Sequence, residues 1–288
     1  MIVEHRNKNS FGMSLFLSLL SLIKRINKRS LLSFVVKKRQ EFIKPKKKHK
    51  ANTFIIEGIN VLKFGTNSKE KKIIIYFHGG GYVLKGTRRH YNFIMNLSKL
   101  VGIDSYYVDY PIAPDNKAKS VIKQSLLVVE KIEEMTKAKE VIFLGDSAGA
   151  NLALVLSKHK ENIKKLFLMS PWLDLTMTNP DIVDLEEKEL MFTKEELLSA
   201  ARDYQGSYDL SDGQISPINE DFGDKSIFIF AGTDDILYPD VLRFHHKNPG
   251  IILHSYYKLP HDFMFIFQGK EQNRVIEQIA KYLQLERN

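Results

Sequence analysis

Short apolar runs alternate with longer amphipathic stretches from about residue 51 to the end of the chain. Runs rich in β-branched and aromatic residues are typical of buried strands, and they occupy 54–64, 71–77, 104–108, 141–144, 166–169, 227–231 and 252–257. Apolar residues at helical spacing predict helices within 90–101, 115–136, 148–160 and 274–285. Strands that alternate with helices favour an α/β fold, with a mostly parallel central sheet covered by helices on both faces.

The region between Trp172 and Asp224 breaks this rhythm. It has no strand pattern, and helical stretches such as 194–204 prevail. An insertion that follows a strand end in a parallel sheet lies at the carboxyl edge, where ligands bind. We therefore predict a catalytic domain over 51–288 that carries a helical cap insertion at about 175–222.

Residues 1–50 differ from the rest in charge. They hold 14 Lys and Arg against two Asp and Glu, a net charge of +12, whereas the remainder carries −3. This basic arm is either a solvated segment or one attracted to anionic lipid or phosphate. Its apolar run 11–23 is shorter than the roughly 20 residues that a membrane span needs, and basic residues follow it instead of a cleavage site. We predict that the arm packs on the body as part of the cap.

The strongest chemical signal is Gly145-Asp146-Ser147-Ala148-Gly149, between a predicted strand and a predicted helix. In that setting G-x-S-x-G forms a tight turn that exposes the serine hydroxyl, and glycines flank it because a Cβ there would clash with neighbouring chain. The helix start adds free N–H groups near a developing oxyanion. We predict that Ser147 is a nucleophile; the alternative is an ordinary glycine-rich turn.

A second signal is His78-Gly79-Gly80-Gly81-Tyr82, directly after the strand at 71–77. Consecutive glycines allow backbone N–H groups to point at one acceptor, and with the N–H of Ala148 they would form an oxyanion hole. The alternatives are a flexible loop or a phosphate cradle, but the Lys and Ser/Thr that a phosphate loop needs are missing. We expect His78 to hold the loop and not to act as a base.

A serine nucleophile needs a base that an acid orients, in the chain order Ser, Asp or Glu, His. His261 follows the strand at 252–257 and is the predicted base. For the acid, Asp234 and Asp235 follow the strand at 227–231, and Asp174 follows that at 166–169. The pattern alone leaves these three open.

Other side chains carry weaker expectations. His90 is expected at a helix start on the surface, His245 and His246 in a surface helix, and His254 in a strand. Candidates for lining the substrate pocket are Tyr82, Trp172, Leu190, Met191 and Phe192. The chain has no cysteine, which excludes disulfides and thiolate chemistry, and no metal or dinucleotide motif is found.

Taken together, six motifs resemble the hormone-sensitive-lipase-like branch of the α/β-hydrolases. They are HGGGY (78–82), DYPIAPD (109–115), GDSAGANLAL (145–154), SPWLDL (170–175), GTDDIL (232–237) and PHDF (260–263). The similarity runs from about residue 70 to the C-terminus. It implies an α/β-hydrolase fold and carboxylesterase activity on short or medium acyl chains, without a cofactor.

The resemblance also assigns roles. It places the triad at Ser147, Asp235 and His261 and the oxyanion donors at Gly80, Gly81 and Ala148. Asp235 is preferred because the family's acid stands three residues after a glycine, here Gly232. The family often has glycine or a small residue where this chain has Asp262, and we expect that change not to disturb the base.

The sequence thus predicts a serine carboxylesterase whose partner is a small acyl ester and not a nucleic acid. A membrane-associated lipase using residues 1–50, an amidase or peptidase, and a ligand-binding receptor are the alternatives. A homodimer is left open. The expected location is the cytoplasm, with peripheral membrane association or secretion as alternatives.

Overall fold

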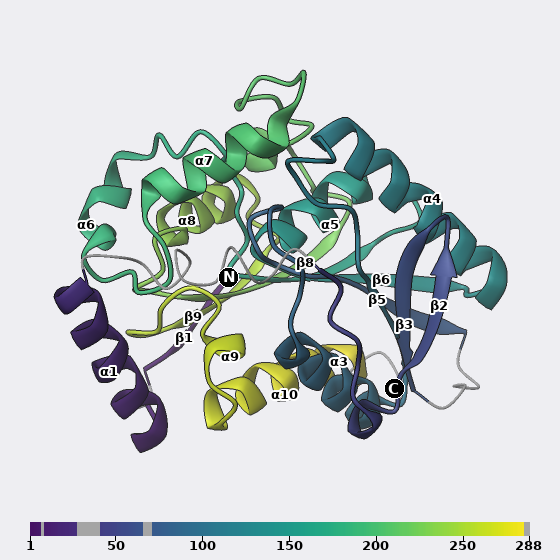
Figure 1. The fold of residues 1–288 in the computed structure, drawn as a ribbon, viewed down its shortest axis with the longest axis horizontal. Helices are drawn as coiled ribbons and strands as arrows, with labels where there is room; N and C mark the ends of the chain where they lie inside the picture. Colours follow the sequence, from purple (N-terminus) through teal and green to yellow (C-terminus); the bar gives the residue numbers. More distant parts are fainter. Residues whose placement is uncertain (7–8, 28–40, 66–70, 285–288) are drawn as a thin grey trace.

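The computed structural model describes residues 1–6, 9–27, 41–65 and 71–284, and its strands form one nine-stranded sheet (Figure 1). The strands are β1 (Ile2–His5), β2 (Asn52–Ile56), β3 (Ile59–Phe64), β4 (Lys72–Phe77), β5 (Asp104–Val108), β6 (Glu140–Asp146), β7 (Lys165–Met169), β8 (Ser226–Gly232) and β9 (Ile252–Tyr256). They lie in the order β1-β9-β8-β7-β6-β4-β5-β3-β2. Every pair is parallel except β2–β3 and β3–β5. The mostly parallel sheet predicted from the pattern is therefore confirmed.

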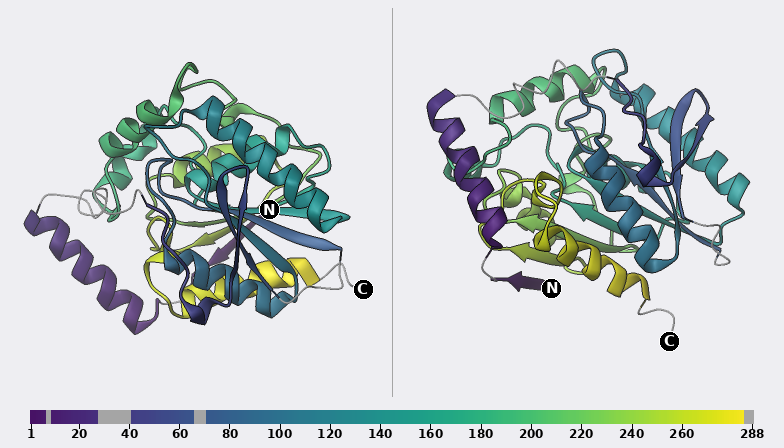
Figure 2. Two further views of the ribbon diagram at one scale, coloured as in Figure 1. Left: turned by 45° about the vertical axis from the view of Figure 1, so that its right-hand side comes forward. Right: turned by 60° about the horizontal axis from the view of Figure 1, so that its bottom comes forward.

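Helices cover both faces of the sheet (Figure 2). They are α1 (Phe11–Asn27), α3 (Arg88–Val101), α4 (Ala118–Thr136), α5 (Ala148–Lys158), α6 (Val183–Glu186), α7 (Lys194–Gln205), α8 (Tyr238–Lys247), α9 (Phe263–Ile266) and α10 (Lys270–Gln284). α3 and α10 pack on one face, and α4, α5 and α8 on the other. Alternate residues of β4 serve the two cores, with Ile75 in one and Ile74 in the other. Burial on both faces explains why central strands such as β4, β7 and β8 are mostly apolar.

The strand register places the chemical motifs at one edge of the sheet. Phe77 at the end of β4 pairs with Gly145, and Asp146 at the end of β6 pairs with Met169. Gly232 at the end of β8 pairs with Tyr256. The loops after β4, β6, β8 and β9 therefore leave the sheet side by side, which is where ligands bind in a parallel sheet.

Between β7 and β8 the chain forms α6, α7 and two 3-10 turns, η3 (Pro180–Ile182) and η4 (Pro217–Asn219), and this fully described interval contains no strand. It lies over the carboxyl edge of the sheet (Figure 1). Tyr204 of α7 stacks on Tyr82 of the glycine loop, with ring centroids 3.6 Å apart. Asn151 of α5 donates hydrogen bonds to the carbonyls of Trp172 and Ile215. These contacts fasten the insertion to the catalytic core.

The N-terminal arm performs two structural roles. Its first residues form β1, an edge strand beside β9 that the hydrophobic pattern did not predict. α1 then packs through the buried Met13, and its Phe16 contacts the Phe267 ring at 5.8 Å between centroids. Lys24 Nζ donates to the carbonyls of Glu186 and Glu189 in the cap insertion. The apolar run therefore packs on the body, and Lys24 at the end of α1 contacts the cap insertion. Residues 28–40 of the arm lie outside the described residues.

Candidate active site

Ser147 occupies a strained turn between β6 and α5. Its backbone has φ 51° and ψ −119°, and its N–H donates to the carbonyl of Met169 at 2.8 Å. A non-glycine residue with this backbone is costly and persists only where surrounding contacts hold it, as at a nucleophile elbow. The residue is 3% exposed and lines a cavity of about 650 Å³.

Close packing accounts for the glycines beside this turn. A Cβ on Gly149 would collide with the carbonyl oxygen of Phe77, at the end of β4. A Cβ on Gly145 would collide with the carbonyl of Gly149 itself. The glycines let β4, β6 and α5 approach each other, as the motif predicted.

The glycine loop after β4 lines the same cavity as Ser147. Gly80 and Gly81 have φ of +120° and +61°, which glycine adopts without steric cost. The Gly80 carbonyl accepts the N–H groups of Val83 and Leu84 at 3.1 and 3.0 Å. Among the described residues, the N–H groups of Gly80 and Gly81 donate to no recorded acceptor. Both glycines line the cavity with Ser147, so the two N–H groups are available to a ligand oxygen.

His78 is buried and belongs to the loop, away from the reacting positions. Its Nδ1 lies 2.8 Å from the Gly79 carbonyl, and its ring stacks on Tyr110 with centroids 4.3 Å apart. Burial lowers its pKa well below the usual range, which keeps the imidazole neutral. These contacts suit the expected role of holding the loop.

His261 lies beside Asp235, although 26 residues separate them in the chain. Nδ1 of His261 is 3.1 Å from both carboxylate oxygens of Asp235, and both side chains are buried. Asp235 Oδ1 also accepts the N–H of Leu237 at 2.9 Å. The ring of Phe192 from the cap meets the imidazole edge-on at 4.6 Å. His261 and Ser147 line the same cavity.

The structure separates the three acids that the pattern left open. Asp174 accepts hydrogen bonds from Thr176 and lies 3.7 Å from Arg243. Asp234 is partly exposed, and no contact between it and His261 is recorded. Only Asp235 holds the imidazole at Nδ1.

The expectation that Asp262 leaves the base undisturbed is wrong, because the structure brings the carboxylate of Asp262 against His261. Its Oδ2 lies 3.2 Å from Nε2 of His261, on the ring side opposite Asp235. Burial lowers the pKa of His261, but the charges of Asp235 and Asp262 outweigh burial and raise that pKa well above its usual value. No hydrogen bond joins Ser147 and His261 among the described residues. Such catalytic hydrogen bonds are often long before substrate binds.

Two further buried acids surround the site. Burial alone would raise the pKa of Asp146, but contacts with His90, 3.3 Å away, and with Tyr76 lower it. Glu189 accepts the N–H groups of Met191 and Ile236, and burial followed by the charge of Asp235 raises its pKa to about 7. The surface position expected for His90 is wrong: it is 6% exposed, because its ring caps α3 at Thr87 and turns inward to Asp146.

The cavity is built from the body, the cap insertion and the arm. Its lining comprises Phe16, Leu20, Ile43, Gly79, Gly80, Gly81, Val83, Leu84, Thr87, Arg88, Arg89, His90, Asp146, Ser147, Met191, Phe192, Leu197, Ala200, His261, Asp262, Phe265 and Ile266. Of the residues expected to line the pocket, Met191 and Phe192 do so. Tyr82, Trp172 and Leu190 are absent from the lining.

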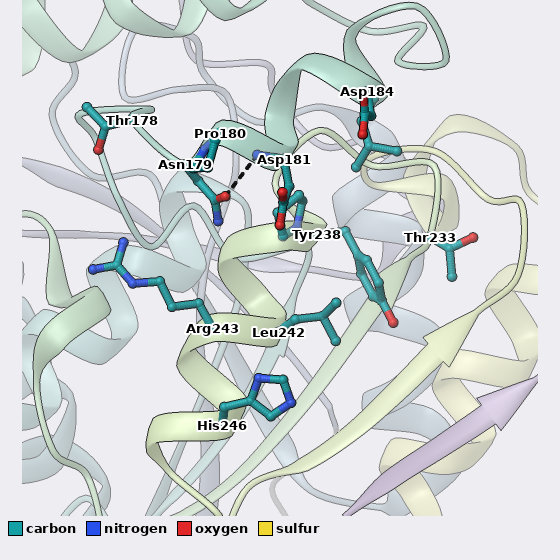
Figure 3. Close-up of a pocket in the computed structure, with 12 residues that line it drawn as sticks. Thr178, Asn179, Pro180, Asp181, Asp184, Thr233, Tyr238, Leu242, Arg243 and His246 are labelled. Atoms are coloured by element: carbon teal, nitrogen blue, oxygen red, sulfur yellow. Dashed lines mark hydrogen bonds between the residues drawn. The ribbon is translucent and has the colours of Figure 1, made fainter.

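A second cavity of about 730 Å³ lies between η3 and α8 (Figure 3). Figure 3 shows Leu242 and His246 on α8 and the Asn179–Asp181 hydrogen bond of η3. The lining of this second cavity includes neither Ser147 nor His261. No cluster of His, Asp and Glu suited to a metal ion was found within the described residues.

The chain is similar to a known protein family and to several known proteins. Residues 74–264 match the family described as alpha/beta hydrolase fold. An esterase of Acinetobacter venetianus is 28% identical over 217 residues, covering 71% of this chain and 70% of that protein. Steryl acetyl hydrolase 1 of Saccharomyces cerevisiae is 31% identical over 127 residues, covering 40% of this chain and 30% of that protein. The crystal structure of a hormone-sensitive lipase from a metagenome library shares the fold, with a TM-score of 0.80 at 20% identity, covering 95% of this chain and 98% of that one. The chain therefore belongs to the α/β-hydrolase fold family, and its relatives include an esterase and an acetyl hydrolase.

Proposed function

We propose that the protein is a serine carboxylesterase that hydrolyses short- to medium-chain acyl esters through an acyl-enzyme on Ser147. One observation carries the proposal. The strained Ser147 lines the same cavity as His261, whose Nδ1 is held 3.1 Å from Asp235. A nucleophile, a base and an acid in the chain order of this fold make up the machinery of acyl transfer.

In the proposed mechanism, Ser147 Oγ attacks the ester carbonyl while Nε2 of His261 takes the hydroxyl proton. Asp235 accepts the Nδ1–H and stabilises the imidazolium that forms. The N–H groups of Gly80, Gly81 and Ala148 donate to the oxyanion. His261 then gives its proton to the leaving alcohol, and water, activated by the same base, hydrolyses the acyl-enzyme. The reaction needs no cofactor.

The cavity and the relatives both support small acyl groups. A volume of about 650 Å³ with Phe16, Leu20 and Phe192 on its walls accommodates a short or medium apolar chain. Relatives of this chain include the yeast steryl acetyl hydrolase, whose name specifies an acetyl group. We therefore expect acetyl to hexanoyl esters to be preferred over long-chain esters.

The test compares wild-type protein with Ser147→Ala on p-nitrophenyl esters from acetate to palmitate. We expect kcat/KM to peak among the short chains and kcat to fall at least about 10⁴-fold in the variant. A fluorophosphonate probe should label wild type only. Full activity in Ser147→Ala would overturn the mechanism. Lack of labelling would favour a ligand-binding receptor, and faster turnover of p-nitroanilides than of the matched esters would favour an amidase.

A second proposal concerns the outer side of α1. Phe11, Leu15, Leu19 and Leu22 recur at helical spacing and are 84%, 60%, 52% and 53% exposed. The opposite side contributes Phe16 and Leu20 to the cavity wall. Within the part of the chain that the structure describes, none of the helices combines the length and the hydropathy of a membrane span. We propose that α1 lies on an anionic membrane surface, because an apolar helix stripe within an arm of charge +12 suits such a surface.

Vesicle sedimentation tests this second proposal. Full-length protein should bind vesicles containing phosphatidylserine, and Leu15→Gln/Leu19→Gln should weaken binding at least about tenfold. The double variant Leu100→Gln/Met135→Gln removes comparably exposed apolar side chains on other helices and should bind like wild type. Equal binding by all three proteins would refute a role for α1. A dimer that the α1 variant dissociates would assign the stripe to self-association.

A further inference from the structure

A carboxylate contacts the ring nitrogen that the proposed mechanism uses as the base. Asp262 Oδ2 is 3.2 Å from Nε2 of His261, and the Asp262 side chain is 14% exposed. Its second oxygen, Oδ1, is buried and has no hydrogen-bond partner among the described residues. Nε2 is also the atom that must accept the proton of Ser147. Asp262 and Ser147 therefore compete for one position on the imidazole.

The backbone at Asp262 does not require a carboxylate. Its φ of 50° and ψ of 32° are left-handed, a region that glycine and asparagine also adopt. Its N–H donates to Ser170 Oγ at 3.1 Å, and its carbonyl accepts the N–H groups of Phe265 and Ile266. Every one of these turn contacts is made by the backbone of residue 262. The contribution specific to aspartate is therefore its contact with His261.

We propose that Asp262 is a positioning residue: in the free enzyme it accepts the Nε2–H of protonated His261 and so sets the pH above which His261 can serve Ser147. This inference rests on the proposed function, in which Nε2 is the proton acceptor. Before Nε2 can accept the Ser147 proton, its own proton must pass to solvent or to Asp262. An ionised Asp262 opposes its loss to solvent, because that loss would leave the neutral ring between two carboxylates.

Other titratable groups face the pair from neighbouring elements. Asp235 follows β8, Glu189 belongs to the cap and Asp146 ends β6, and each adds negative charge when ionised. Beyond Asp146 lie His90 of α3 and Tyr76 of β4. Burial raises the pKa of Asp262 itself to about 7, so its own charge changes near neutrality. Among these acids, Asp262 is the one in recorded contact with Nε2.

The test measures how fast a fluorophosphonate labels Ser147 as a function of pH. This reaction forms the Oγ–P bond, releases fluoride and passes the serine proton to His261. The labelling rate therefore falls at low pH, where His261 is protonated. The midpoint of this fall, the acid limb of the pH profile, reports the pKa of His261 without an ester substrate. Asp262→Asn and Asp262→Gly should each move the limb about one unit or more toward low pH. One unit below the wild-type midpoint, wild type should react at about a tenth of its plateau rate and each variant at about half or more.

Asp234→Asn is the matched control, since it removes a neighbouring acid that has no recorded contact with His261. Its limb should coincide with that of wild type. A limb unmoved in both Asp262 variants would overturn the inference, and so would a drop in rate that is equal at every pH. The two variants remove the charge differently, so a folding defect in one, checked by circular dichroism, leaves the other informative. Absence of labelling in wild type would instead contradict the proposed function.

Discussion

The two sides of the active site are built differently. Ser147, Gly145 and Gly149 lie within five residues of chain, and a neighbouring strand end supplies the glycine loop. His261 instead meets Asp235, Glu189 and Phe192, which come from separate loops and from the cap. The nucleophile side is thus determined by local backbone geometry, whereas the base side depends on packed charges brought together by the fold.

The two sides should respond differently to substitution. On the nucleophile side an added methyl group meets backbone that cannot move aside, so errors there cost stability. On the base side several buried carboxylates surround one imidazole, so errors there change protonation and rate. Substitutions on the nucleophile side should therefore change the free energy of unfolding, whereas those on the base side should change the reaction rate and its pH dependence.

The largest effect is expected from Asp235→Asn, on the base side. The amide cannot hold His261 with its proton on Nδ1 as the carboxylate does, so kcat on p-nitrophenyl acetate should fall about 10⁴-fold, equivalent to about 5.5 kcal/mol. The melting temperature should change little. Asp234→Asn is the control and should stay within a few-fold of wild type. Similar losses of kcat in both variants would mean that Asp235 is not the only acid that orients His261.

Gly149→Ala tests the nucleophile side. Its Cβ would collide with the carbonyl oxygens of Phe77 and His78, which belong to the β4 backbone and its loop. Overpacking of this kind costs about 2–3 kcal/mol, which urea unfolding would measure. Gly250→Ala, where no atom lies within 4 Å, should be close to neutral. Equal stability of the two variants would show that the elbow can relax.

Glu189→Gln separates charge from packing on the base side. Burial, followed by the charge of Asp235, raises the pKa of Glu189 to about 7 from an ordinary value of 4.5. Because the folded pKa is the higher one, the wild type loses stability as pH rises through this range. The variant lacks that loss. Its free energy of unfolding relative to wild type should rise on the order of 2 kcal/mol between about pH 5 and pH 8; parallel stability curves would contradict this.

The smallest effect on stability is expected for Lys24→Met, which removes the hydrogen bonds between α1 and the cap. Lys24 Nζ donates to the carbonyls of Glu186 and Glu189 at 2.8 and 2.6 Å. Losing these hydrogen bonds should cost about 1 kcal/mol of unfolding free energy. Lys47→Met, at an exposed lysine, is the control. If the two variants are equally stable, α1 is held by its apolar contacts alone.

Much of the fold and the site could be predicted from the sequence. Apolar runs located the strands of the catalytic domain to within a few residues, because strands buried on both faces are mostly apolar. The glycine pattern around Ser147 predicted a tight turn, because few other residues fit at positions where neighbouring backbone segments pack closely. The edge strand β1 escaped prediction, since four residues with mixed burial carry little periodic signal.

The sequence was enough to predict the strands of the catalytic domain, the elbow at Ser147, the glycine loop and the chain order of the candidate triad. These features are local, and backbone sterics and hydrophobic periodicity encode them within short windows. The hydrophobic and polar pattern left Asp174, Asp234 and Asp235 open, and the three-dimensional contacts show that Asp235 is the one that faces His261. They also show that His90 turns inward and that Asp262 contacts Nε2 of His261. The contacts of Asp235 and His90 depend on distances between segments remote in the chain, and the contact of Asp262 with its neighbour His261 depends on the left-handed backbone at residue 262. Electrostatic interactions in a buried site change steeply with such distances.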